Sequence, residues 1–293
     1  MLPDDVFLEI FDFYMIECFR QRFRQRIEGW EILAHVCRRW RTVVFQSPHR
    51  LNLRLLCTPN TATRATPDIW PPLPLIIQDF CGAFDLWRGT SSVDNIIAAL
   101  ERNDRIRQID LRYLTSLRMG YVTDSAAIHK PFPELTDLQL AIYGEDEPGS
   151  MLPDSFLAGT APLLRKLSLD GISYPGLPKL LLSATHLVGL SLHNIPPTGY
   201  IPPEAMATSL IALTNLESLR LRFRHPRPRT ALEGRRLPPR PLTRSILPNF
   251  TNIWFKGSSE YFKEILARID TPRLNSLYIT FFNQIIFDTP QLF

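Results

Sequence analysis

The feature that most constrains the fold of this chain is a spacing of apolar residues that recurs seven times. In each instance an apolar residue is followed by a second one three positions later and by a third one two positions after that. The last two residues share one face of an extended strand, because side chains alternate along a strand. The instances are Ile106/Ile109/Leu111, Leu135/Leu138/Leu140, Leu164/Leu167/Leu169, Leu187/Leu190/Leu192, Leu216/Leu219/Leu221, Phe250/Ile253/Phe255 and Leu274/Leu277/Ile279. Such self-similarity is typical of solenoids, in which each unit stacks on its neighbours.

The interval between successive instances is long enough for a complete structural unit. The first apolar positions are separated by 23 to 34 residues, which is room for one strand, one helix and two turns. Stretches with helical spacing fill these intervals, and we expect helices at residues 93–102, 154–158, 177–184, 203–213 and 259–268. The pattern predicts an α/β fold, an irregular leucine-rich-repeat solenoid with parallel strands on the concave face and helices outside. The alternative is a set of amphipathic strands in an ordinary α/β sheet.

The predicted repeats lack the asparagine ladder of a regular solenoid. A regular repeat has Asn or Cys eight positions after its first leucine. The residues at that position here are Leu114, Tyr143, Ile172, Ile195, Arg224, Ser258 and Phe282. We therefore expect an uneven horseshoe.

The segment before the repeats has mainly helical spacing. We expect a helix at residues 3–16, where Pro3 and two acidic residues suit a first turn, and another at 30–44, ended by Pro48. Residues 19–27 also place apolar side chains four apart between arginines, which is typical of a solvated helix face. Short strands are expected at residues 51–55, 73–77 and 284–287, and polar surface loops at residues 58–68 and 144–150.

Positive charge is concentrated in one segment. Residues 220–244 contain nine arginines and one glutamate, a local charge of +8, and the whole chain carries +4, so the other residues sum to −4. Within this segment, residues 225–244 are rich in proline and arginine and fall in the longest interval between repeats. We expect a solvated loop inserted there. A contact with an acidic partner is the first alternative, and a nuclear-localisation or nucleic-acid role is the least favoured one.

The sequence contains no recognisable pattern for catalysis or for metal binding. The six histidines form no H-x-x-x-H pair, and the cysteines Cys18, Cys37, Cys57 and Cys81 form no C-x-x-C pair. We therefore expect no enzyme activity, no catalytic or metal-ligating residue, no cofactor, and packed, reduced thiols. No apolar run reaches the roughly 20 residues that span a bilayer, and the first residues leave no room for a secretory leader. We expect a cytoplasmic or nuclear protein, or one present in both, without a membrane partner.

Two short motifs resemble an F-box. They are Leu2-Pro3-x-x-Val6-x-x-x-Ile10-Phe11 and Val36-Cys37-Arg38-Arg39-Trp40, and the resemblance covers about residues 2–46. With the repeats behind it, nearly the whole chain resembles large fungal families of F-box proteins with C-terminal leucine-rich repeats. The resemblance implies a helical F-box at residues 1–50 and a repeat domain at 51–293. It also implies a partner, Skp1, and through it a cullin.

The resemblance implies a set of Skp1-contacting residues, which a physical argument supports. Three short helices cannot bury all the apolar side chains of this segment, and an uncovered apolar face marks a partner site. The implied contacts are Leu2, Pro3, Val6, Ile10, Phe11, Val36, Cys37 and Trp40. We expect Pro3, Val6 and Ile10 to face the partner most directly and Trp40 to lie toward the core.

The residues between the inward leucines predict a second binding surface. They face the concave side of a repeat sheet, and in the early repeats they are small and polar. In the late repeats they include large side chains of the types that dominate interface energies. The predicted target-binding residues are Arg220, Arg222, Trp254, Lys256 and Tyr278. Their positive charge favours a target with an acidic or phosphorylated segment.

Taken with these patterns, the resemblance implies a non-catalytic adaptor. One end would bind Skp1 of a Skp1–cullin–F-box ubiquitin ligase and the other would bind a protein target for ubiquitin-dependent degradation. The alternative is a repeat scaffold outside any ligase, in which an F-box-like cap seals the end of the solenoid. An apolar patch exposed on the first helix would distinguish the two, because a sealing cap would bury it.

Overall fold

The computed structural model describes residues 2–20, 29–48, 50–51, 53–58, 72–79, 93–142, 150–226 and 244–282. Five of the expected segments lie wholly or largely outside these ranges. They are the helical stretch 19–27, the loops 58–68, 144–150 and 225–244, and the strand 284–287.

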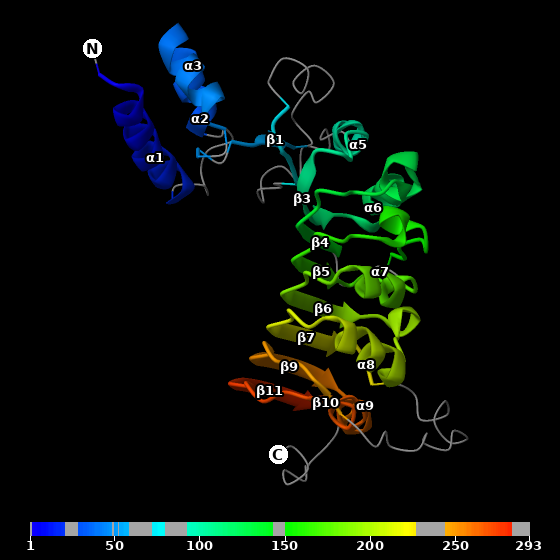
Figure 1. Cartoon of the computed structure of the whole chain (residues 1–293). Helices are drawn as coiled ribbons and strands as arrows, with labels where there is room; N and C mark the ends of the chain where they lie inside the picture. Colours follow the sequence, from blue (N-terminus) through cyan, green and yellow to red (C-terminus); the bar gives the residue numbers. More distant parts are fainter. Residues whose placement is uncertain are drawn as a thin grey trace.

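A single parallel sheet runs through most of the molecule (Figure 1). Its nine strands are β1 (Leu55–Cys57), β2 (Leu75–Gln78), β3 (Ile106–Leu114), β4 (Asp137–Ile142), β5 (Lys166–Asp170), β6 (Gly189–Ile195), β7 (Ser218–Phe223), β9 (Asn252–Gly257) and β11 (Ser276–Phe281). Neighbours in the sheet follow the order of the chain, so each of these strands pairs with the strand before it and the strand after it. The α/β class and the parallel strands are confirmed, in a solenoid-like arrangement.

The register of the sheet aligns the repeated apolar residues. Leu138 on β4 pairs with Leu167 on β5, which pairs with Leu190 on β6, and the third positions of the triplets align in the same way. These residues all point to one face. They are almost fully buried in the first six triplets, and Leu277 and Ile279 of the last triplet are half-buried. Burial of each such side chain stabilises the fold by about 1.5–3 kcal/mol, so the repeated spacing fixes both the strands and their register.

The helices cover the face of the sheet to which the apolar residues point. Figure 1 shows them along one side of the arc of strands, while the strands line the other side. They are α5 (Val93–Leu100), α6 (Ser116–Asp124), α7 (Leu177–Ser183), α8 (Pro203–Ala212) and α9 (Ser259–Leu266), with single 3₁₀ turns at η2 (Ala126–His129), η3 (Phe156–Gly159) and η4 (Pro197–Gly199). The helices expected at 93–102, 177–184, 203–213 and 259–268 are confirmed. One more parallel pair, β8 (Ser245–Ile246) with β10 (Ile269–Asp270), forms a separate small sheet.

Two predictions about the helices were wrong or incomplete. The segment 154–158 forms no α-helix, because Leu157 and Ala158 both have φ of 54°, in the left-handed region that ends a right-handed helix. Helix α6 was not predicted, since its exposed Leu117 and Tyr121 blur the apolar stripe. Its start is nevertheless marked by Thr115, whose hydroxyl accepts a hydrogen bond from the Arg118 amide.

Three helices precede the sheet: α1 (Asp4–Arg20), α2 (Gly29–Val36) and α3 (Arg38–Gln46). The helix expected at 3–16 is confirmed and is longer. The single helix expected at 30–44 was wrong, because the chain is extended at Cys37 (φ −159°, ψ 170°). There the Cys37 sulfur accepts a hydrogen bond from the Trp40 amide at 3.5 Å and caps α3. The break turns one expected helix into two that pack against each other.

The N-terminal helices and the sheet share a continuous apolar core. Trp30 is fully buried, and its indole Nε1–H donates to the Arg54 carbonyl oxygen at 2.8 Å, just before β1. Leu51 and Leu53 are buried too, but they precede the strand, so the strand expected at 51–55 begins only at Leu55. The strand expected at 73–77 is confirmed as β2. Among the helices of the described ranges, none is long and apolar enough to span a membrane.

Candidate functional site

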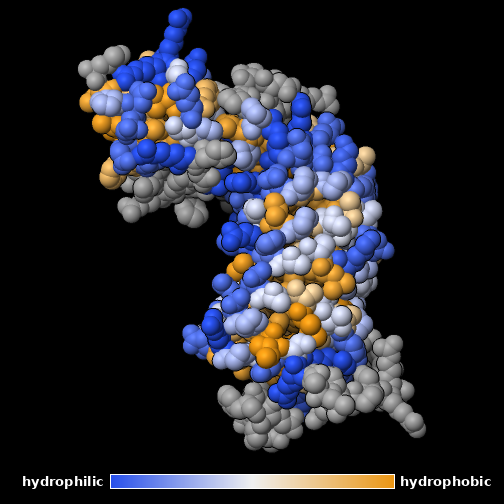
Figure 2. Space-filling model, in the orientation of Figure 1, coloured by the Kyte–Doolittle hydropathy of each residue, from blue (hydrophilic) through white to orange (hydrophobic). Residues whose placement is uncertain are grey.

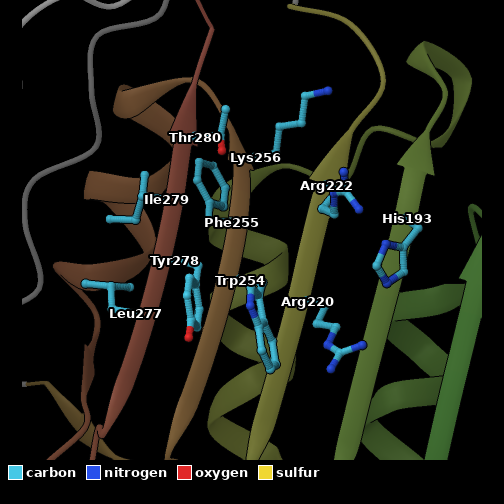
Figure 3. Close-up of a pocket in the computed structure, with 10 residues that line it drawn as sticks. All are labelled: His193, Arg220, Arg222, Trp254, Phe255, Lys256, Leu277, Tyr278, Ile279 and Thr280. Atoms are coloured by element: carbon cyan, nitrogen blue, oxygen red, sulfur yellow. The ribbon is translucent and has the colours of Figure 1, made fainter.

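The concave face of the sheet presents two rows of side chains near its C-terminal end. In the first row Arg220 on β7 pairs with Trp254 on β9, which pairs with Tyr278 on β11. In the second, Arg222 pairs with Lys256. They alternate with buried residues such as Leu221 and therefore point away from the core. The structure thus brings the five predicted target-binding residues together, around a hollow of about 730 Å³ (Figure 3).

The first row forms a continuous stack. The Trp254 indole lies between two neighbours: the Arg220 guanidinium carbon is 4.0 Å from its ring centroid, and the Tyr278 ring is 5.4 Å away at an interplanar angle of 8°. The indole therefore has a neighbour on each side and is half-buried, while Tyr278 remains 58% exposed. A stack of this kind holds its side chains in place before a partner arrives, which lowers the entropic cost of binding.

The second row supplies positive charge without a matching acid. Among the described residues, neither Arg222 nor Lys256 takes part in an ion pair, and the residues that line the hollow include no Asp or Glu. Lys256 Nζ lies 5.6 Å from the ring centroid of Phe282. The hollow is therefore suited to a ligand that carries negative charge.

His193 on β6 also lines the hollow and was missed in the choice of site residues. Burial lowers the pKa of its imidazole, Arg222 and Arg220 lower it further, and the Asp170 carboxylate on β5 acts in the opposite direction. The signal was present in the sequence, since His193 occupies the repeat position on β6 that Arg222 occupies on β7.

The N-terminal half of the concave face is chemically different. Asp110 is buried, and its carboxylate accepts two hydrogen bonds from Arg112, at 2.6 and 2.8 Å. The next outward residues in this row are Gln139, Ser168 and Ser191. Within the described ranges, charge is thus neutralised at one end of the sheet and left without an acidic partner at the other.

The N-terminal helices carry the residues expected to contact Skp1. Six of them are exposed, namely Leu2, Pro3, Val6, Ile10, Val36 and Cys37, and Trp40 is half-buried. Phe11 is 0% exposed, and the centroid of its ring lies 4.9 Å from the centroid of the Trp40 ring. Phe11 therefore supports the helices from inside and presents no surface to a partner. The expectation that Cys37 is packed was also wrong, because it caps α3 at the surface.

An apolar stripe runs along the outer face of α1. Val6, Ile10 and Phe13 follow helical spacing and are all exposed, Phe13 by 75%. Figure 2 shows apolar side chains gathered on this end of the molecule. Phe13 was missed as a site residue, although its position three after Ile10 could have indicated it. Arg39 holds the start of α1 in place: its guanidinium donates to the Leu2 carbonyl oxygen and, at 2.8 Å, to Asp4 Oδ1.

No protein-family model matches the chain, and comparison with curated proteins finds no similar sequence. Within the described ranges, no group of His, Cys, Asp or Glu side chains is arranged to hold a metal ion. Two surfaces of the described structure are suited to binding a partner, the apolar stripe of α1 and the basic hollow on β6 to β11.

Proposed function

We propose that this protein is a substrate-recognition adaptor of a Skp1–cullin–F-box ubiquitin ligase. Helices α1 to α3 form the F-box and bind Skp1. The strands and helices that follow form leucine-rich repeats and bind a protein target. The observation that carries the proposal is the exposed apolar stripe on α1, at the opposite end of the molecule from the basic hollow.

The repeat assignment is supported by sequential stacking. Each repeat contributes one strand, the second and third apolar residues of its triplet face the core, and the described helices between the strands cover that face of the sheet. A unit of this kind cannot bury its apolar face alone, and stacking makes one long core with a broad outer sheet surface. A broad, preformed surface suits the recognition of an extended protein segment.

The exposed stripe favours the adaptor over a scaffold with a sealing cap. A cap that only closed the solenoid would turn its apolar residues inward. In this structure α1 buries Leu8 and Phe11 and leaves Val6, Ile10 and Phe13 in contact with solvent. Exposed apolar side chains that adjoin one another on a small helical unit mark a contact with another protein.

The adaptor acts by bringing two proteins together. Holding a target on the sheet while Skp1 and the cullin hold the rest of the ligase raises the effective concentration of the target near the ubiquitin-charged enzyme. The basic hollow selects a target with an acidic or phosphorylated segment. In this proposal the complex acts in the cytoplasm, in the nucleus or in both.

The test is co-purification with Skp1. We expect the wild-type chain to retain Skp1 and the Pro3→Ala/Ile10→Asp variant to lose it, because a carboxylate in the centre of the stripe must be desolvated on binding. Leu117→Asp is the matched control, since Leu117 is 68% exposed on α6, away from the stripe. Circular dichroism checks that all three chains are folded. A folded wild-type chain that fails to retain Skp1 would remove the ligase assignment and leave the scaffold.

A further inference from the structure

His193 lies where an anionic ligand of the hollow would meet it. It lines the same hollow as Arg222 and Lys256, and Figure 3 shows its imidazole beside Arg222 on the neighbouring strand. The position is at the boundary between the charge-neutralised and the basic parts of the concave face. Asp170 pairs with His193 in the register of β5 and β6, and the arginines lie on β7.

The surroundings of His193 disfavour the protonated form of its imidazole. The groups that act on it are Asp170 on β5 and the two arginines on β7. One oxygen of the Asp170 carboxylate already accepts a hydrogen bond from Asn194 Nδ2 at 2.7 Å. Burial and the two cations outweigh Asp170, so the pKa of His193 lies below its ordinary value. The imidazole is thus neutral at pH 7 in the unliganded protein.

An anion in the hollow would reverse this balance. Burial and the two arginines disfavour the imidazolium of His193. A negative group between Arg222 and Lys256 offsets the repulsion from the arginines and gives the imidazolium a nearby opposite charge. We propose that an oxyanion of the target, a phosphate or a carboxylate, is bound by Arg222, Lys256 and His193, and that His193 takes up a proton as it binds. This inference rests on the proposed function of the concave face as the target site.

The same geometry argues against a single-stranded nucleic acid as the source of the phosphate. Proteins that bind single strands stack the bases on exposed aromatic faces. The Trp254 indole lies between Arg220 and Tyr278, so Tyr278, which is 58% exposed, is the one ring of this row that could offer a face to a base. The row therefore provides no platform for successive stacked bases. The stack therefore acts as a fixed wall beside the anion, against which an apolar side chain of a protein segment can pack.

Proton uptake makes binding depend on pH in a defined direction. Because linkage is reciprocal, an anion that raises the pKa of His193 binds more tightly once His193 is protonated. The gain is fully present below the pKa of the free protein and is lost as pH rises through the raised pKa of the complex. A rise of one unit corresponds to about tenfold tighter binding at the acidic end of this window.

The experiment follows the His193 ring by NMR in the full chain, with and without sodium sulfate, whose charge is constant between pH 5 and pH 8. Sodium chloride at equal ionic strength controls for screening, and His193→Asn assigns the signal. We expect sulfate to raise the titration midpoint of His193. The ring signals of His129, which is half-buried and hydrogen-bonded to Ser155, should not move on addition of sulfate at fixed pH. Failure of sulfate to bind, or binding that does not move His193, would overturn the proposal.

Variants separate the binding cations from general charge effects. Arg222→Gln/Lys256→Gln should abolish the sulfate-induced shift, whereas Lys166→Gln, which removes an exposed cation from β5 of the same sheet, should preserve it. A shift that survives the double change would place the anion elsewhere and refute the site. Peptides that differ only in a serine, a phosphoserine or a glutamate then show which oxyanion is preferred, and a single-stranded oligonucleotide that competes better than these would refute the protein target.

The outcome can be separated from that of the ligase proposal. Sulfate and peptide binding are measured without Skp1, and Skp1 co-purification is measured without an anion. If Skp1 is not retained but the His193 shift is observed, the anion site stands on a scaffold. If Skp1 is retained but His193 does not respond, the ligase adaptor stands and its target is recognised in another way.

Discussion

The two ends of this molecule expose opposite kinds of side chain. The N-terminal helices leave apolar residues in solvent, whereas the last strands leave cations and stacked aromatic rings. Exposed apolar surface lowers solubility until a partner covers it, so it suits a long-lived contact. Charged surface is stable in water and mainly provides orientation and specificity, so it suits a partner that comes and goes. The difference is the one expected of an adaptor with one permanent and one exchangeable partner.

The sharpest test of this comparison uses two phenylalanines on one helix. Phe11 is 0% exposed and packs against Trp40, while Phe13 is 75% exposed. We expect Phe11→Ala to lower the free energy of unfolding by about 3–5 kcal/mol and Phe13→Ala to change it by less than about 0.5 kcal/mol. Urea unfolding followed by circular dichroism measures both.

Skp1 binding should show the reverse order for these variants. Phe13→Ala should weaken co-purification of Skp1 from a fully folded chain, since Phe13 lies on the apolar stripe. If Phe13→Ala destabilises the chain as much as Phe11→Ala does, then Phe13 is covered within the protein. The stripe would in that case be a packed face, and the contrast between the two ends would fail.

Thiol reactivity tests the contrast between surface and core. Cys37 is exposed at the start of α3, whereas Cys57 is buried on β1, and burial raises its pKa from 9.0 to about 11. At pH 8 the thiolate fraction of Cys57 is then about 100-fold below that of an unperturbed thiol. We expect iodoacetamide to label Cys37 and to spare Cys57, with peptide mass spectrometry as the readout.

The direction of the pH effect adds a second check. Labelling of Cys57 should increase only as pH approaches 11, because the raised pKa delays formation of the thiolate. Labelling in guanidinium chloride provides the control, since both cysteines should then react at similar rates. Equal rates in the folded protein would show that β1 opens readily and that the core does not extend to this end of the sheet.

The sequence allowed more to be predicted for the repeats than for the helices before them. Leu167 and Leu169 have close counterparts in six other repeats, so an error in one instance is corrected by the rest. The break at Cys37 has no such support, because it depends on one sulfur–amide contact between two apolar stretches. Helix α6 was not predicted for a related reason, because the exposed Leu117 interrupts the spacing of its buried apolar residues.

The candidate sites, too, could be predicted from the sequence only in part. Alternation along β7 and β9 sufficed to place Arg220 and Trp254 on the outer face. The stack between them depends on strand register and rotamers, which a linear pattern does not contain. Phe11 and Phe13 are indistinguishable by residue type, and only the packing of Trp40 makes one internal. The burial of His193, on which its proposed role depends, arises from contacts between strands.

Truncation of the stack should disrupt the target surface alone. We expect Trp254→Ala/Tyr278→Ala to lower target capture more than about tenfold, because each aromatic anchor of an interface typically contributes 1–2 kcal/mol or more. Skp1 co-purification should be unchanged, because the stack lies on the last strands. Quantitative affinity purification compares this variant with Ser168→Ala/Ser191→Ala, which changes small side chains of the same sheet face. Retained capture by the aromatic variant would place the target elsewhere.

The smallest effect concerns the cap that separates α2 from α3. The Cys37 sulfur accepts from the Trp40 amide at 3.5 Å, and a hydroxyl is a better acceptor at this position of a helix. We expect Cys37→Ser to raise the free energy of unfolding by up to about 1 kcal/mol and Cys37→Ala to lower it by about 0.5 kcal/mol. Because Cys37 is exposed beside Val36, Skp1 binding by the same two variants shows whether this sulfur also contacts the partner. Weaker Skp1 binding by a more stable Cys37→Ser chain would show that the Cys37 sulfur both caps α3 and contacts Skp1. Unchanged binding would show that the sulfur only caps α3 and that the Skp1 contact is confined to the stripe on α1.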